Sequence, residues 1–134
     1  MEKSIRGISE MTLLEHQQYH GAVYQAEPHA EINKHEFRLY SQNGEDGILL
    51  WLFSRIGTTS KKFVEFGMGT GRECISSNLV LNMGWKGYFM DGSDENVADA
   101  NLFFKLMMPW EEFAKLQIEK KFISKENIKE ILKY

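Results

Sequence analysis

Three glycines stand at alternate positions between two carboxylates, a pattern that suits a cofactor site. Residues 63–73 read FVEFGMGTGRE, which places Gly67, Gly69 and Gly71 directly after Glu65 and a short apolar run. Glycine has no Cβ, so such a main chain can turn sharply and let a ligand lie against it. Asp91 follows 20 residues after Gly71, the usual separation for a carboxylate that binds ribose hydroxyls. The pattern predicts a site for a nucleoside-containing cofactor.

The spacing of the glycines separates two classes of cofactor. The dinucleotide fingerprint is G-x-G-x-x-G, whereas this chain has G-x-G-x-G. Glu65 at the end of a strand suits a cofactor with an ammonium group better than one with a pyrophosphate. From the residues alone, two plainer alternatives stay open: the glycines form only a tight strand-to-helix turn, or Asp91 and Gly92 form only a turn.

Alternating strands and helices must position these residues. Apolar runs and turn signals predict strands over residues 61–66, 86–91 and 115–123, and helices over 10–27, 45–57, 73–84, 93–107 and 125–134. The expected helix caps are Ser9, either Ser93 or Asp94, and Ser124. This alternation predicts an α/β fold with a parallel sheet, and it places the glycines and Asp91 at the carboxyl edge of that sheet.

Size and composition exclude several function classes. A chain of 134 residues is long enough for one domain, and its net charge of −3 gives no support to a nucleic-acid-binding face. The single cysteine, Cys74, rules out an internal disulfide, and we expect it to be a small buried residue. His16 and His20 are an i, i+4 pair without a third ligand, so no metal site is expected. No run has the length of a membrane span, and we expect a soluble cytoplasmic protein with no membrane partner.

Three blocks of sequence together resemble the FkbM-type methyltransferase-like family. They lie within residues 40–56, 63–93 and 122–132 and read YSQNGEDGIL, FVEFGMGTGRECISSNLVLNMGWKGYFMDGS and FISKENIKEIL. Ile75 and Ser76 depart from the Asn and Thr that are common in the family at this helix start. The resemblance implies a class I, Rossmann-like sheet flanked by helices. It divides the chain into an N-terminal helical or irregular segment, residues 1–40, and a cofactor-binding domain, residues 41–134.

The resemblance also implies roles for individual residues. Glu65 and the three glycines would surround the methionine part of S-adenosyl-L-methionine, and Asp91 would bind its ribose. Further cofactor contacts would come from Gly92 and Ser93, near the adenine, and from Gln42, Asn43 and Glu45. Glu45 and Asp46 are the nearest candidates for a general base, but the segment 42–46 could equally be a helix cap.

In this family the last helix is normally followed by an aspartate-rich strand and further elements. The sequence would then correspond to strands 1 to 3 of a sheet ordered 3-2-1-4-5-7-6, and one edge of strand 61–66 would have no partner. We therefore expect either a fragment of a longer enzyme or a homo-oligomer.

Three functions remain open at this point. The first is an S-adenosylmethionine-dependent methyltransferase, or its cofactor-binding half, which transfers a methyl group to an unidentified acceptor and releases S-adenosylhomocysteine. The second is a non-catalytic module that binds either compound and works by assembly with another chain. The third is an enzyme of the dehydrogenase type, which the glycine spacing and Glu65 disfavour.

Overall fold

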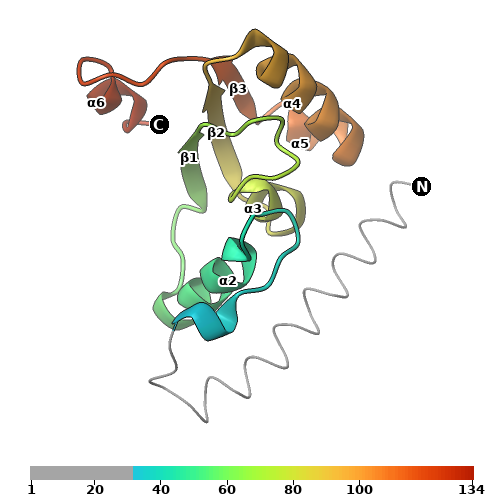
Figure 1. Ribbon diagram of the computed structural model, residues 1–134, viewed down its shortest axis with the longest axis vertical. Coiled ribbons are helices and arrows are strands. Elements are labelled where there is room, and N and C mark those ends of the chain that lie inside the picture. The colour runs from blue at the N-terminus through green and yellow to red at the C-terminus, as the bar shows by residue number, and fades with distance from the viewer. Residues whose placement is uncertain (1–31) are drawn as a thin grey trace.

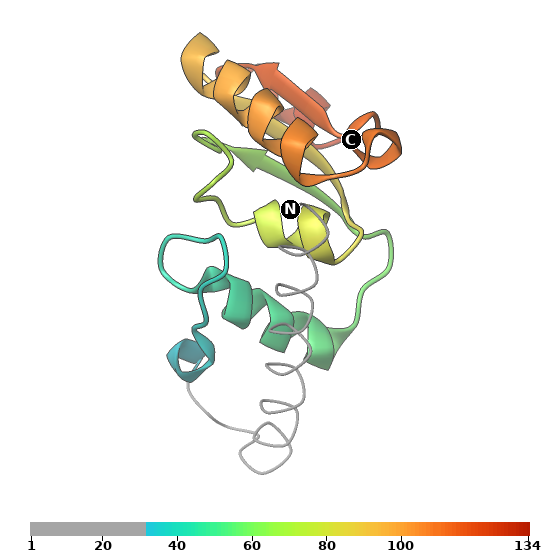
Figure 2. The same ribbon diagram turned by 90° about the vertical axis from the view of Figure 1, so that its right-hand side faces the viewer.

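The computed structural model describes residues 32–134, which form a three-stranded parallel sheet flanked by helices (Figures 1 and 2). The strands are β1 (Lys62–Phe66), β2 (Lys86–Asp91) and β3 (Gln117–Lys120), in the spatial order β1-β2-β3. The helices are the 3-10 turn η1 (Ile32–His35), α2 (Glu45–Ile56), α3 (Ser77–Asn82), α4 (Asp94–Met107), α5 (Trp110–Phe113) and α6 (Ile128–Ile131). The α/β class and the parallel sheet predicted from the sequence are confirmed. The helix predicted over residues 10–27, the Ser9 cap and the His16/His20 pair lie outside the described residues.

The register of the sheet places the ends of β1 and β2 side by side. Phe66 pairs with Met90, and Asp91 at the end of β2 pairs with Lys120 at the end of β3. All three strands run in the same direction, so the segments that follow them meet at one edge of the sheet. Within residues 32–134, β1 pairs with β2 alone, and its outer edge carries no strand.

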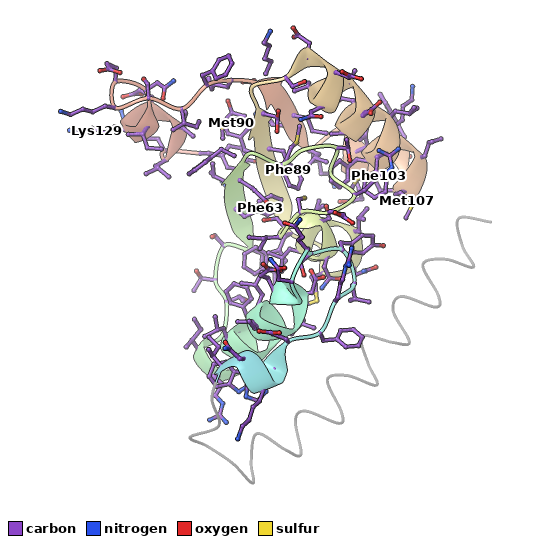
Figure 3. The ribbon with its side chains drawn as sticks, in the orientation of Figure 1. Phe63, Phe89, Met90, Phe103, Met107 and Lys129 are labelled. Atoms are coloured by element: carbon purple, nitrogen blue, oxygen red, sulfur yellow. The ribbon has the colours of Figure 1, made fainter. Side chains whose placement is uncertain are left out.

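The main core lies on one face of the sheet, under α3 and α4. Phe89 of β2 is fully buried between two other rings, with centroids 4.9 Å from Phe63 of β1 and 5.0 Å from Phe104 of α4 (Figure 3). Successive side chains of a strand point to opposite faces, so the neighbours of Phe89 on β2 face the other way. Tyr88 and Met90 accordingly pack under Ile131 of α6. Figure 2 shows α3 and α4 on the near side of the sheet and α6 behind it.

Two of the predicted helices have the caps that the sequence indicates. α2 has Glu45 and Asp46 in its first turn and closes at Gly57, whose N–H donates to the carbonyl of Phe53 over 2.9 Å. Gly57 has a φ of 73°, a conformation that glycine adopts without penalty. α4 is capped by Ser93, whose Oγ accepts a hydrogen bond from the N–H of Asn96 over 3.2 Å.

Other boundaries differ from the sequence-based prediction. The helix expected over residues 73–84 is reduced to α3; Ile75 and Ser76 lie in a turn before it, where their N–H groups donate to a carboxylate outside the helix. The helix expected over residues 125–134 is reduced to α6, and the side chain of Ser124 does not cap it. Instead, the side chain of Asn127 accepts from the N–H of Ser124 and donates to the carbonyl of Phe122. β3 spans four residues of the nine expected, and the short helix α5 was not predicted.

No helix in the part of the chain that the structure describes has both the length and the apolar character needed to cross a membrane.

Candidate functional site

The loop that follows β1 is hydrogen-bonded to the end of β2. The N–H groups of Gly67 and Met68 both donate to the carbonyl of Met90, over 2.8 and 3.3 Å. The N–H of Gly69 donates to the carboxylate of Asp91 over 2.9 Å. The glycine-containing loop, residues 67–71, is therefore held against the strand end that carries Asp91, as the sequence predicts.

All three glycines of this loop have positive φ values, but they face different surroundings. Gly67 and Gly69 have φ values of 74° and 59°, and a Cβ added to either would project into open space. Gly71 has a φ of 78°, and a Cβ there would come within 2.6 Å of the ring of Phe104. Gly71 is thus required by core packing, whereas Gly67 and Gly69 present bare main chain on the outer side of the loop.

Glu65 holds the segment that follows the glycine-containing loop. Its two carboxylate oxygens accept hydrogen bonds from the N–H groups of Ile75 over 3.1 Å and of Ser76 over 2.8 Å.

Burial, and then the negative charge of Glu65, raise the pKa of the Cys74 thiol to about 12. Cys74 is buried, as predicted, and at neutral pH it is a protonated, unreactive thiol.

Asp91 is bonded to three parts of the site. Oδ2 accepts from the N–H of Gly69, and Oδ1 accepts from the N–H of Ser93 over 2.9 Å and from the side-chain amide of Asn96 over 3.1 Å. Partial burial acts to raise the pKa of Asp91, but the hydrogen bonds from Ser93, Asn96 and Gly69, with a smaller contribution from the backbone of Gly92, together outweigh it and hold that pKa below its usual value. Oδ1 accepts two of the hydrogen bonds above and Oδ2 accepts one, so Oδ2 keeps an acceptor position for a ligand.

The block of residues 41–47 is tied by hydrogen bonds to the segment just before it. Asp46 is 1% exposed, and its Oδ2 accepts hydrogen bonds from the N–H groups of Leu39, Tyr40 and Ser41 at 2.7–2.8 Å and from the Ser41 hydroxyl at 2.9 Å. The N–H of Asn43 donates to Glu45 over 2.8 Å. The backbone N–H groups of Glu45 and Asn43 hold the pKa of the Glu45 carboxyl below its usual value.

The structure brings some of the predicted site residues together and leaves others apart. Glu65, the three glycines, Asp91, Gly92 and Ser93 form one cluster at the carboxyl ends of β1 and β2. Gln42 and Asn43 are exposed in the segment before α2. This segment lies on the same side of the molecule as the glycine-containing loop, and an ion pair between Arg38 and Glu73 (2.8 Å) joins the two (Figure 2).

Three contributors to the site were not predicted from the sequence. Asn96 orients Asp91, Phe104 supports the loop beneath Gly71, and Phe122 lies against Gly92. The spacing of Asn96, three residues after the Ser93 cap, is a signal that could have been used, because the first turn of a helix faces its cap. Phe104 and Phe122 are distant in sequence from the loop, and nothing local marks them.

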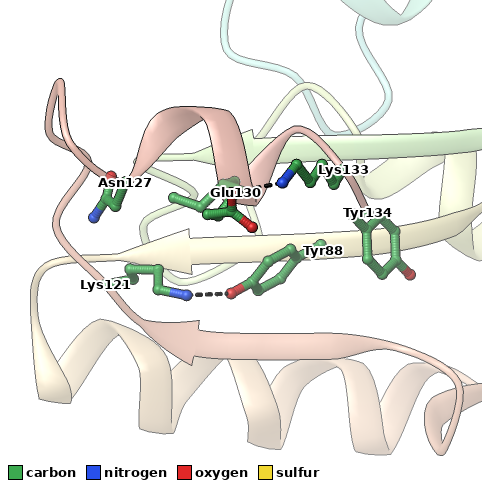
Figure 4. Close-up of a pocket in the computed structure, with 7 residues that line it drawn as sticks. Tyr88, Lys121, Asn127, Glu130, Lys133 and Tyr134 are labelled. Carbon is green, nitrogen blue, oxygen red and sulfur yellow. Dashed lines mark hydrogen bonds and ion pairs between the residues drawn. The ribbon is translucent and has the colours of Figure 1, made fainter.

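A separate hollow of about 410 Å³ opens on the opposite face of the sheet, between α6 and the strands (Figure 4). Tyr88, Lys121 and Tyr134 are among its lining residues, and Lys121 donates to the hydroxyl of Tyr88 over 2.9 Å. Its lysines also pair with carboxylates, Lys121 with Glu119 and Lys133 with Glu130. Within residues 32–134, no group of three or more His, Cys, Asp or Glu side chains is placed to hold a metal ion.

Neither a protein-family model, nor a curated protein, nor a solved structure matches this chain.

Proposed function

We propose that this chain binds S-adenosyl-L-methionine at the carboxyl ends of β1 and β2 and is an S-adenosylmethionine-dependent methyltransferase of the FkbM-like type, or the Rossmann-like cofactor-binding half of one. The observation that carries the proposal is the open main chain at Gly67 and Gly69, beside a carboxylate that keeps an acceptor position. A strand end, a glycine turn and an acid at the next strand end are typical of nucleoside-cofactor sites.

The surrounding groups fit the two ends of this cofactor. The free acceptor position of Asp91 suits a ribose hydroxyl, which would donate to it. Each oxygen of Glu65 accepts one N–H in the structure, so each keeps a lone pair, and the negative charge suits the ammonium group of the methionine part. Gly67 and Gly69 would let the sulfur region lie against the main chain without meeting a side chain.

The bound cofactor would supply an activated methyl group on a positively charged sulfur. The chain would then have to align the acceptor with that methyl group and exclude water. Asp46 fits a positioning role, because it is buried and its carboxylate binds the main chain of residues 39–41. Glu45 is the more accessible of the two candidates for a base, but its lowered pKa makes it a weak one. The proposal therefore assigns a proton transfer to neither residue.

A pair of matched glycine variants tests the cofactor site. Gly67 and Gly57 have φ values of 74° and 73°, and a Cβ at either position meets open space. Alanine at either position should therefore destabilise the fold by about 1–3 kcal/mol, and Gly57, whose ψ of −178° lies in a region almost restricted to glycine, should lose at least as much as Gly67. Only the alanine at position 67 intrudes on the proposed ligand. Asp91→Ala is a less clean test, because Asp91 also holds Gly69 and Ser93 in place.

We expect calorimetry to show that Gly67→Ala weakens binding of S-adenosylhomocysteine at least about tenfold, a loss of about 1.4 kcal/mol, because the added methyl group would occupy space that the ligand needs against the main chain. Gly57→Ala should bind like the wild type. Equal affinities for Gly67→Ala and the wild type would remove the ligand from this loop. Binding of NAD in place of either adenosyl compound would favour the dehydrogenase alternative.

The second candidate is a non-catalytic adenosyl-binding module that works by assembly, either as a homo-oligomer or with another chain. Within the described residues, 32–134, the outer edge of β1 carries no strand, and this favours the module because exposed strand edges pair readily with other strands. The N–H of Gly67 points toward β2, so by alternation the N–H of Val64 points toward the open edge. Val64→Pro would remove that donor, and we expect it to abolish any self-association seen by sedimentation.

Turnover separates the two candidates. Release of S-adenosylhomocysteine from S-adenosylmethionine in the presence of an acceptor supports the methyltransferase. Cofactor binding without turnover, in a protein that assembles through β1, supports the module.

A further inference from the structure

Phe122 is a large apolar side chain that is held in an exposed position beside the proposed site. It follows β3 by two residues, and 72% of its surface is exposed. A single exposed hydrophobic residue is ordinary in a folded protein. Two further observations, its fixed backbone and its contact with Gly92, distinguish Phe122 from such a residue.

The backbone on both sides of Phe122 is fixed by hydrogen bonds. The N–H of Lys121 donates to the carbonyl of Asp91 over 2.9 Å, which extends the pairing of β3 with β2 by one residue. The carbonyl of Phe122 accepts from the side-chain amide of Asn127 over 2.8 Å, and Asn127 in turn accepts from the N–H of Ser124 over 2.8 Å. The ring therefore projects from an ordered support and not from a free loop.

The ring of Phe122 lies against Gly92, the residue that follows Asp91. A Cβ added to Gly92 would come within 2.5 Å of that ring, so the contact depends on the absence of a side chain there. The other parts of the ring remain exposed. A flat apolar surface is thus placed one residue away from the carboxylate proposed to bind ribose.

We propose that Phe122 is the platform on which the base of the bound nucleoside stacks, and that it sets the preference of the site for a ligand with an aromatic base. This inference rests on the proposed function. The base and sugar of a nucleoside are joined by one glycosidic bond, so a base whose ribose is held by Asp91 must lie directly beside that carboxylate. Aromatic side chains bind bases by stacking, at about 1–3 kcal/mol per base in proteins that bind single-stranded nucleic acids.

The test compares ligands with and without the base. Titration calorimetry of the full chain would use S-adenosylhomocysteine and S-ribosylhomocysteine, which lacks the adenine. Phe122→Ala should weaken binding of S-adenosylhomocysteine about 5- to 150-fold, the range that corresponds to loss of one aromatic–base stack. It should leave the affinity for S-ribosylhomocysteine unchanged. A purely structural role for Phe122 would weaken the binding of both compounds.

Three further variants sharpen the result. Phe122→Tyr keeps the ring and should bind S-adenosylhomocysteine within about threefold of the wild type. Gly92→Ala should displace the exposed ring without unfolding the protein, and it should weaken binding in the same way as Phe122→Ala. Trp110→Ala is the matched control, because Trp110 is a 65% exposed aromatic residue beyond the far end of α4.

The possible failures are distinguishable. If the wild type does not bind S-adenosylhomocysteine, the proposed function fails and the platform fails with it. If the wild type binds and Phe122→Ala binds equally well, the platform alone is overturned. A Phe122→Ala variant that changes the sedimenting mass but keeps its affinity would show Phe122 to be an interface residue, which also overturns the platform.

Discussion

Replacing Asp46 should destabilise the protein far more than replacing an exposed acid. Its carboxylate accepts the N–H groups of three consecutive residues, of which Ser41 is buried while Leu39 and Tyr40 are half-buried. Asp46→Ala leaves the buried Ser41 N–H without an acceptor, at about 1–3 kcal/mol, and each half-buried donor adds about 1 kcal/mol because water can partly replace the carboxylate. The expected loss is about 3–5 kcal/mol, a large part of the 5–15 kcal/mol typical of a whole domain.

Asp46→Asn provides a graded comparison. The amide oxygen can still accept hydrogen bonds, but charge-assisted bonds are about twice as strong as neutral ones, so we expect a loss between those of the wild type and the alanine variant. Urea unfolding followed by far-ultraviolet circular dichroism would give the free energies by linear extrapolation. Asp99→Ala is the control, because Asp99 is an exposed acid on α4.

The ranking of these variants decides the role of Asp46. A loss below about 1 kcal/mol for Asp46→Ala, close to that of Asp99→Ala, would refute the positioning role, since such values are typical of surface substitutions. If Asp46→Asn retained full stability and bound cofactor but lost turnover, Asp46 would be a proton acceptor in the reaction. The hydrogen bonds to residues 39–41 lead us to expect the loss of stability.

Two further predictions concern titratable groups at the site. The folded-state pKa of Asp91 lies below its ordinary value of 3.8, so its contribution to stability should be complete above about pH 5 and be lost as the pH falls through 3.8 toward the folded-state value. Urea unfolding between about pH 5 and pH 3 should therefore show a weaker pH dependence for Asp91→Asn than for the wild type, and equal slopes would contradict this. The pKa of Cys74 is raised to about 12, so the native protein should not react with a thiol reagent such as dithionitrobenzoate at neutral pH. The unfolded chain should react fully, and rapid labelling of the native protein would show that Cys74 is accessible.

The strands and the glycine-containing loop could be predicted from the sequence because their signals are local. The apolar run before Gly67 and the run that ends at Asp91 indicate buried strands, and the structure places both within one residue of the expected ranges. β2 is buried as expected, whereas β1 is half-buried with exposed ends. The acidic start and glycine end of α2 are equally local. Parallel pairing then follows from the alternation of strands and helices.

The differences arise where tertiary contacts override local preference. The sequence from Glu73 onward has helical character, but the helix begins only at Ser77. The side chain of Glu65, which lies ten residues before Ile75, binds the N–H groups of Ile75 and Ser76 in the turn that precedes it. The last helix is shortened because Asn127 binds the segment before it. In both cases a side chain binds the main chain just before the helix and holds it in a turn instead of a longer helix.

The same contacts bear on how the site could work. Both acids at the glycine-containing loop are already bonded to the protein's own main chain, which fixes the loop before any ligand arrives. A loop ordered in advance loses little conformational freedom on binding, so more of the interaction energy appears as affinity. The arrangement would fail as a site if these bonds used every acceptor position and filled the open side of the loop. Asp91 keeps an acceptor, and Gly67 and Gly69 keep their outer side clear. Glu65 and Asp91 can therefore order the loop and still contact a ligand, and neither role excludes the other.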